Sequence, residues 1–229
     1  MLDIQGKWVL LTGASRGIGR QVVGALADGG CRLILHSRKR EHTAALVADL
    51  RARGLTVHAL EAELSDQQQV VALGEEALRI SGGIDILYNN AAIQADWHED
   101  KFATIVDEYR LSFQVNTIAP ITLCNLILPS MIERGFGRVV NITSGIKDQP
   151  ELMAYAASKA ALDKYVYDMA PHLAGTGVTM NLLDPGWLRT DLGGPQAPNA
   201  VESVLPGAMV PVLLEDGSCG KWFSAQDYR

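Results

Sequence analysis

The sequence predicts a single α/β domain built on a doubly wound parallel sheet of about seven strands with helices on both faces. Short, β-rich apolar runs alternate along the chain with longer helical patterns. A Gly-rich turn follows the first apolar run and opens a helix. With 229 residues, 48% of them hydrophobic, the chain can bury one core of this Rossmann-type architecture. We find no repeat or linker dividing residues 1–229.

The elements follow from the apolar runs and their breaks. We expect strands at residues 7–11, 33–36, 56–60, 84–88, 138–142, 178–183 and 219–224. Helices are expected from the Gly-rich turn to residue 28, near 41–53, at 66–80, as two helices within 94–134, and around Tyr155 to about 174. Because helical crossovers between parallel strands are right-handed, this order predicts a parallel sheet. The Gly and Pro residues of 193–211 predict a lid over a site, around 192–211.

Composition narrows the function classes. The net charge is -6, and Lys and Arg are scattered, which disfavours nucleic acid and anionic membranes as partners. No apolar run approaches the ~18 residues of a membrane span, and the first residues lack a signal-peptide pattern, so we expect a cytoplasmic protein. The sequence has three cysteines: Cys31, Cys124 and Cys219. Their number is odd and their spacing is not that of metal ligands, so we expect neither a disulfide nor a metal site.

The segment Tyr155-Ala-Ala-Ser-Lys159 is the central chemical feature. On a helix its four-residue interval places the phenol and the ammonium on one face, one turn apart. A neighbouring cation lowers a phenol's pKa, which suits a general acid/base for an alcohol or ketone. Ser144, eleven residues upstream, is the candidate to hold the reacting oxygen. Taken alone, such a pair is also a common surface feature.

The Gly-rich turn runs from Thr12 to Gly19, with the spacing Gly-x-x-x-Gly-x-Gly. Glycines let a backbone approach a ligand closely, and the following helix directs its free N–H groups and positive dipole at a phosphate. The turn lies between a strand and a helix, as dinucleotide binding requires. A purely structural turn is the alternative.

The end of the second strand indicates which dinucleotide is bound. The chain continues through His36-Ser37-Arg38-Lys39-Arg40 and has no carboxylate there until Glu41, and Arg16 lies in the Gly-rich turn. An acid at this point would accept from the ribose of NAD, whereas Arg favours the 2'-phosphate of NADP. We therefore expect NADP(H), with NAD(H) as a second cofactor. Alternatively, the basic run is only the solvated start of a helix.

The chain from Gly6 to about Leu192 resembles the classical short-chain dehydrogenases/reductases. Thr12 to Gly19 resembles their cofactor turn, and Asn89-Asn90-Ala91-Ala92 resembles their Asn-Asn-Ala-Gly segment. The segment from Asp184 to Asp191 resembles their Pro-Gly turn. The resemblance implies hydride transfer between a nicotinamide and a carbonyl or alcohol, with a catalytic tetrad of Asn116, Ser144, Tyr155 and Lys159.

The resemblance also implies the cofactor contacts. They comprise Tyr155 and Lys159 together with Gly13, Ser15, Arg16, Gly17, Ile18, Gly19, Ser37, Arg38, Glu63, Leu64, Asn90, Ala91, Pro185, Gly186, Leu188 and Thr190. Lys159 is expected to lower the Tyr155 pKa and bond the nicotinamide ribose, and Asn116 to fix a water. Three departures stand out: Ala92 for Gly, Glu63 for Asp or Asn, and a short interval between Ser144 and Tyr155.

The predicted function is an NADP(H)-dependent carbonyl reductase or alcohol dehydrogenase acting on a small carbonyl or secondary alcohol. The tail resembles the family's carbonyl-reductase branch. Two alternatives stay open: a catalytically silent dinucleotide-binding regulator, and a sugar-nucleotide epimerase or dehydratase, although only 39 residues follow Thr190 for a further substrate domain. The family's habit predicts a homo-dimer or homo-tetramer, with a monomer left open. Met153, Ile146, Trp187 and Leu192 line either the substrate pocket or the core.

Overall fold

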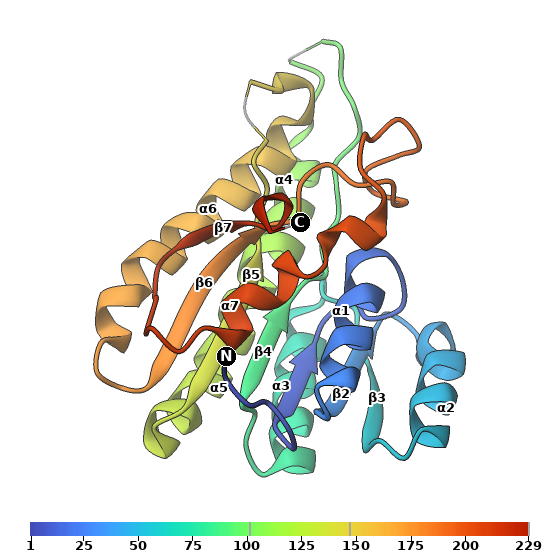
Figure 1. The fold of residues 1–229 in the computed structure, drawn as a ribbon. Coiled ribbons are helices and arrows are strands. Elements are labelled where there is room, and N and C mark those ends of the chain that lie inside the picture. The colour runs from blue at the N-terminus through green and yellow to red at the C-terminus, as the bar shows by residue number, and fades with distance from the viewer. Residues whose placement is uncertain (101, 147, 229) are drawn as a thin grey trace.

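The computed structural model describes residues 1–100, 102–146 and 148–228. Its centre is a parallel sheet of seven strands in the order β3-β2-β1-β4-β5-β6-β7 (Figure 1). The strands are β1 Trp8–Leu11, β2 Arg32–Ser37, β3 Val57–Glu61, β4 Ile86–Asn89, β5 Gly137–Ile142, β6 Val178–Asp184 and β7 Trp222–Ser224. The predicted doubly wound α/β fold is confirmed.

Helices cover both faces of the sheet (Figure 1). Side chains alternate along β1, so Val9 and Leu11 pack on one face while Trp8 and Leu10 pack on the other. The first face is covered by α1 Gly17–Asp28, α2 Ala44–Ala52 and α7 Val210–Leu213. The second is covered by α3 Gln67–Ser81, α5 Ala119–Arg134 and α6 Met153–Met169, with α4 Val106–Phe113 preceding α5. The sheet is therefore buried on both sides.

The strand order reverses at β1, which pairs with β2 on one side and with β4 on the other. The connections after β1 and β4 leave in opposite directions at such a point, and a crevice opens beyond the carboxyl ends of the two strands. The predicted Gly-rich turn follows β1, and the segment of Asn90 and Ala91 follows β4. The fold thus brings these two motifs to one edge of the sheet.

Residues 94–134 differ from the expected two separate helices. The described residues from 94 to Ile105 are irregular, and α4 then continues into α5 through a π-helical turn, Gln114–Ile118. The combined helix Val106–Arg134 has a mean hydropathy of 1.5 over its most apolar window, so by length and composition it could cross a membrane. In this fold 56% of that window is buried inside the domain, as in a core helix.

The late Gly- and Pro-rich segment is more firmly packed than the expected lid. Val204, Ala208 and Val212 are fully buried on the α1 face of the sheet. In the part before residue 200, Leu188 forms a bridge with Asn199, and Leu188 and Ala197 are buried. The predicted seventh strand also begins later, at Trp222, and before it Met180 N donates to Cys219 Sγ at 3.3 Å.

Candidate active site

Tyr155 and Lys159 lie one turn apart on α6, as their spacing predicts. Both are buried, with 7% and 2% of their surface exposed. The Lys159 Nζ lies 5.9 Å from the centre of the Tyr155 ring and donates a 2.8 Å hydrogen bond to the carbonyl oxygen of Ile142 at the end of β5. The helix and the strand end therefore hold the ammonium directly behind the phenol.

Ser144 follows β5, and its side chain lies close enough to the Tyr155 phenol to favour a lower pKa of that phenol. Its Oγ also accepts from Ile146 N at 3.3 Å, which fixes the start of the loop before α6. Two hydroxyls thus meet at one point, where both could donate to an oxygen atom of a ligand. The fold brings Ser144, Tyr155 and Lys159 together as the sequence predicts.

The electrostatics of the pair differ from the expectation. Burial raises the pKa of Tyr155, and the neighbouring Ser144 side chain opposes that shift. Burial lowers the pKa of Lys159 to about 8, while nearby Asp163 raises it. The Tyr155 pKa is therefore raised here rather than lowered, because desolvation of the phenolate outweighs its other interactions.

Asn116 lies fully buried in the π-helical turn. Its Oδ1 accepts from Ile93 N at 2.9 Å, and its Nδ2 donates to Ile93 O at 2.9 Å and to Ser158 Oγ at 3.0 Å. Both amide hydrogens are thus engaged with protein atoms. The side chain ties the segment after β4 to α6 beside Lys159, so in this arrangement it acts as a brace for the tetrad.

Two carboxylates near the tetrad were not among the predicted residues. Thr143 Oγ1 donates to Asp163 Oδ1 at 2.5 Å, and the pKa of Asp163 is raised by burial. Asp184 accepts from Gly186 N at 3.0 Å. Both carboxylates also raise the pKa of Tyr155. Asp163 lies four residues after Lys159, and Asp184 lies at the end of β6. These two positions are the sequence signals from which both carboxylates could have been predicted.

The Gly-rich turn is packed so closely that side chains are excluded. A Cβ on Gly19 would lie 2.1 Å from the Gly13 carbonyl oxygen, and one on Gly13 would lie 2.9 Å from Ala91 Cα. Helix α1 begins at Gly17 with no side-chain cap on its first turn. The free N–H groups and the positive dipole end therefore point out of the turn, and this geometry fits a dinucleotide pyrophosphate.

Thr12 organises the crevice, although sequence reasoning missed it. Its Oγ1 accepts from Asn90 N at 3.0 Å and from Ala91 N at 3.1 Å. The Asn90 side chain donates back to Thr12 O at 2.9 Å and to Gly13 O at 3.1 Å. The turn after β1 and the segment after β4 are thereby fixed to each other, so the two motifs form one surface.

The basic end of β2 is arranged only in part as expected. Ser37 is buried, its Oγ donates to Lys39 O at 2.7 Å, and Arg38 is exposed beside it. Arg16, expected on the same phosphate, instead pairs with Asp191 at 2.6 Å. The guanidinium of Arg16 thus spans from the Gly-rich turn to the segment after β6.

The other predicted contacts lie at the same sheet edge. Glu63 and Leu64 follow β3, where Glu63 Oε1 accepts from Ser65 N at 3.1 Å and Leu64 is buried. Gln226 donates to Pro185 O at 2.8 Å and so fixes the turn after β6. Thr190 approaches the Gly-rich turn, since a Cβ on Gly17 would lie 3.5 Å from its Cγ2. In the described part of the chain we find no cluster of potential metal ligands.

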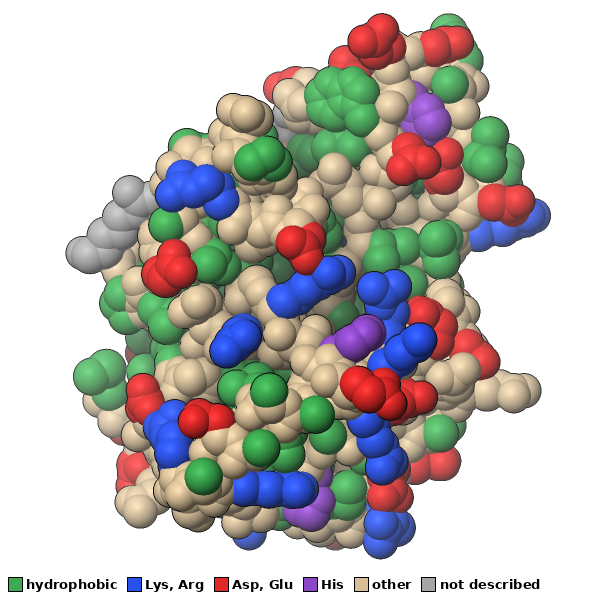
Figure 2. Space-filling model, turned by 90° about the vertical axis from the view of Figure 1, so that its right-hand side faces the viewer, with side chains coloured by type: hydrophobic (Ala, Val, Ile, Leu, Met, Phe, Trp, Pro, Cys, Tyr) green, Lys and Arg blue, Asp and Glu red, His purple; other side chains and the backbone are tan. Residues whose placement is uncertain are grey.

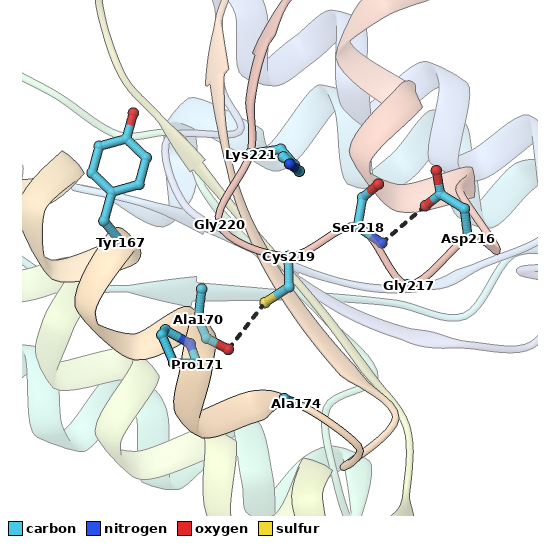
Figure 3. Close-up of a pocket in the computed structure, with 10 residues that line it drawn as sticks. All are labelled: Tyr167, Ala170, Pro171, Ala174, Asp216, Gly217, Ser218, Cys219, Gly220 and Lys221. Carbon is cyan, nitrogen blue, oxygen red and sulfur yellow. Dashed lines mark hydrogen bonds between the residues drawn. The ribbon is translucent and has the colours of Figure 1, made fainter.

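A surface pocket of about 630 Å³ lies away from this site (Figure 3). Its walls are the end of α6 with the following turn, including Tyr167 and Pro171, and the segment from Asp216 to Lys221. This segment precedes β7, so the pocket lies where the parallel strands begin, at the opposite end of the sheet from Tyr155. None of the predicted site residues lines it.

The fold and this site define a doubly wound dinucleotide-fold protein with Ser144 beside a buried Tyr-Lys pair at the carboxyl edge of its sheet. Residues 7–200 match the model of the short chain dehydrogenase family. The chain belongs to that family.

Relatives of known sequence agree with this assignment. The ketoacyl reductase HetN of Nostoc is 37% identical over 190 residues, which cover 82% of this chain and 66% of that protein. The uncharacterized oxidoreductase YvrD of Bacillus subtilis is 34% identical over 188 residues, which cover 81% of this chain and 70% of that protein. The chain spans slightly less than two thirds of the length of the first relatives it matches.

Solved structures match over almost the whole chain. A blue fluorescent protein from a metagenomic library, in complex with NADPH, is 27% identical with a TM-score of 0.88 and 97% coverage of both chains. A short chain dehydrogenase from Burkholderia cenocepacia, in complex with NADP, is 28% identical with a TM-score of 0.87 and the same coverage. An NAD+-bound xylitol dehydrogenase, 22% identical, shares the fold.

Proposed function

We propose that the protein is an NADP(H)-dependent oxidoreductase that interconverts a carbonyl compound and its secondary alcohol. The observation that carries this proposal is the buried Tyr155–Lys159 pair on α6, with Ser144 beside the phenol and the Lys159 ammonium bonded to Ile142 O behind it. This group lies at the same edge of the sheet as the uncapped Gly-rich turn. Acid/base chemistry and dinucleotide binding thus meet in one crevice.

Each residue has a defined role in this proposal. A bound nicotinamide would supply or accept the hydride. Ser144 and Tyr155 donate hydrogen bonds to the substrate oxygen, where negative charge develops as a carbonyl is reduced. Tyr155 delivers the proton, for which its raised pKa keeps it protonated at neutral pH. Lys159 holds a positive charge behind the phenol, and Asn116 braces the helices that carry both residues.

The preference for NADP(H) is supported by the end of β2. Ser37 stands where an acidic residue would accept from a ribose hydroxyl, and the Arg38 guanidinium is exposed beside it. A doubly charged phosphate fits this setting better than a neutral hydroxyl. Structures of two relatives, 27% and 28% identical, hold NADPH and NADP. NAD(H) is proposed as the weaker cofactor.

The decisive experiment is the Tyr155→Phe variant, assayed by NADPH oxidation with a panel of aldehydes and ketones. Loss of the hydroxyl removes the acid and one oxyanion donor together, so the rate should fall by several powers of ten. Binding of NADPH, followed by fluorescence, should stay within a few-fold of the wild type. Tyr167→Phe, on an exposed part of the same helix, serves as the control. A Tyr155→Phe variant that kept most of its turnover would refute the assignment.

A catalytically silent binder is the second candidate. Tight NADPH binding without turnover of any carbonyl in the panel would favour it. The intact Ser144, Tyr155 and Lys159 geometry argues for the active enzyme instead.

We further propose a cytoplasmic homo-dimer or homo-tetramer. The exposed apolar side chains of the α4–α5 helix support self-association, since Val106, Leu111 and Ile118 are 64%, 47% and 42% exposed. Light scattering after size-exclusion chromatography tests this, with Leu111→Glu expected to shift the protein toward monomer. A monomeric wild type would contradict it.

A further inference from the structure

Three segments form the approach to Tyr155. They are residues 91–105 after β4, residues 145–152 between β5 and α6, and residues 187–199 after β6, and all lie above the carboxyl edge of the sheet (Figure 1). His98 N donates to Glu151 O at 3.1 Å and joins the first segment to the second. The His98 ring, in turn, is bonded to Glu108 at the start of α4. Tyr155 itself is only 7% exposed, so a substrate must reach it through the opening between these three segments. We call this opening the mouth.

The mouth carries large apolar side chains that the fold leaves in solvent. In the first segment, Trp97 is 56% and Phe102 is 96% exposed. Met153, at the start of α6, is 37% exposed. In the third segment, Trp187 is 59% and Leu192 is 40% exposed. The Trp187 indole is held in place because its Nε1 donates to Gly193 O at 2.7 Å. Single exposed apolar residues are ordinary, but several around one opening indicate a binding surface.

The charges around the mouth are mostly negative. The three segments contain Asp96, Glu99, Asp100, Asp148, Glu151 and Asp191 against Lys101, Lys147 and Arg189, of which Lys101 and Lys147 lie outside the described residues. The charge of Asp191 is balanced by Arg16, with which it pairs at 2.6 Å. The Arg189 guanidinium is engaged by the carbonyl oxygens of Ala197 and Pro198 at 3.0 and 2.8 Å. Figure 2 shows acidic and hydrophobic side chains together at the top of the molecule, whereas Lys and Arg gather over the middle of that face.

We infer that the substrate is an apolar carbonyl compound or alcohol without negative charge, and that the mouth discriminates against anionic substrates such as carboxylates and phosphate-bearing thioesters. The inference rests on the proposed function and adds its substrate class. Apolar surface favours an aromatic or aliphatic body on the substrate. The acidic rim repels an anion before it reaches Tyr155, and this repulsion weakens as salt screens it.

Three aldehydes with the same ring test the inference: 4-formylbenzoate, its methyl ester, and the 4-trimethylammonio analogue. They place a negative, neutral or positive group far from the reacting carbon. With NADPH at low ionic strength we expect kcat/KM for the ester to exceed that for the carboxylate by about tenfold or more, with the cation close to the ester. High salt should narrow the gap between ester and carboxylate.

Substitutions at the mouth distinguish the effect of the acidic side chains from that of the apolar side chains. The double variant Asp96→Asn/Asp148→Asn should raise kcat/KM for the carboxylate several-fold and leave the ester unchanged, whereas Asp49→Asn, on the exposed face of distant α2, should change neither. Trp187→Ala should raise KM for the ester. Equal or faster reduction of the carboxylate at low ionic strength would overturn this inference alone. No turnover of any aldehyde despite NADPH binding would overturn the proposed function and this inference with it.

Discussion

Lys159 donates its ammonium hydrogen bond to the carbonyl oxygen of Ile142, 2.8 Å away, at a place where only 2% of the lysine surface meets solvent. Burial of a cation costs free energy, and this cost appears as the lowering of the Lys159 pKa from 10.5 to about 8. The Lys159 ammonium is therefore held close to losing its proton near physiological pH.

The first prediction concerns stability and pH. Between about pH 8 and the ordinary lysine pKa of 10.5, the unfolded chain binds more protons than the folded one, so this group makes folding more favourable as pH rises. The wild type should therefore gain stability relative to Lys159→Met between pH 7 and pH 10, by at most about 3 kcal/mol. Urea unfolding of both proteins at several pH values measures this difference.

A control variant and an activity profile complete this test. Lys164→Met removes an exposed lysine of the same helix and should leave the pH dependence unchanged. Reduction of a good substrate by the wild type should fall above about pH 8, because the positive charge behind Tyr155 is then lost. A stability difference between wild type and Lys159→Met that stays constant with pH would argue against a perturbed Lys159.

The second prediction concerns cofactor choice at Ser37, a buried residue beside the exposed Arg38. Ser37→Asp should weaken NADPH binding by tenfold or more, because a carboxylate would face the 2'-phosphate, and should improve NADH binding. Ser37→Asn, similar in size and uncharged, is the matched control. The test is the dissociation constants of NADPH and NADH, measured by fluorescence. An unchanged preference for NADPH over NADH in Ser37→Asp would mean that the 2'-phosphate does not bind beside residue 37.

The third prediction concerns His36, which joins two segments that we expect to contact the cofactor. Its Nδ1 accepts from Gly13 N at 3.3 Å and its Nε2 lies 3.0 Å from Ala62 O, so the neutral ring with hydrogen on Nε2 satisfies both contacts. His36→Leu leaves both backbone groups without this partner. We expect it to weaken NADPH and NADH equally, by about tenfold, since an unsatisfied buried group costs about 1–3 kcal/mol.

Two comparisons give the His36 test its specificity. His36→Gln, which keeps a donor and an acceptor, should recover part of the affinity, and His42→Leu, at an exposed site, should have no effect. Arg38→Ala should weaken NADPH alone, since only NADPH carries the 2'-phosphate. A selective loss of NADPH in His36→Leu would show that the ring acts on the phosphate rather than on the Gly13 turn.

The sequence predicts those parts of this structure that depend on local pattern. The alternation of apolar strands and helices is sufficient for the seven-stranded sheet, and the spacing of Tyr155 and Lys159 is sufficient for their common helix face. The π-helical turn was not foreseen, because periodicity does not distinguish an added residue in a helix from a break between two helices.

Contacts between distant segments account for the other differences. Arg16 was expected to join Arg38 on the 2'-phosphate, yet it pairs with Asp191 from the far half of the chain. Likewise, the direction of the Tyr155 pKa shift depends on its depth in the folded core, which a residue interval does not reveal. Part of the expected lid lies in the core, because Val204 and Val212 are buried on the same face of the sheet as α1.

The last prediction follows from the pair of Arg16 and Asp191, which bridges the Gly-rich turn and the segment after β6 at 2.6 Å. Both side chains are about two thirds exposed, at 66% and 70%, so the pair is worth only about 0.2–1 kcal/mol. If Arg16 must leave Asp191 to meet the 2'-phosphate, Asp191→Asn removes this competition. NADPH should then bind up to about fivefold more tightly at low salt, with the gain shrinking as salt is added, and NADH should bind as before. Asp107→Asn, which breaks the exposed pair with Arg110, is the control, and weaker NADPH binding in Asp191→Asn would show instead that the pair closes the site over its cofactor.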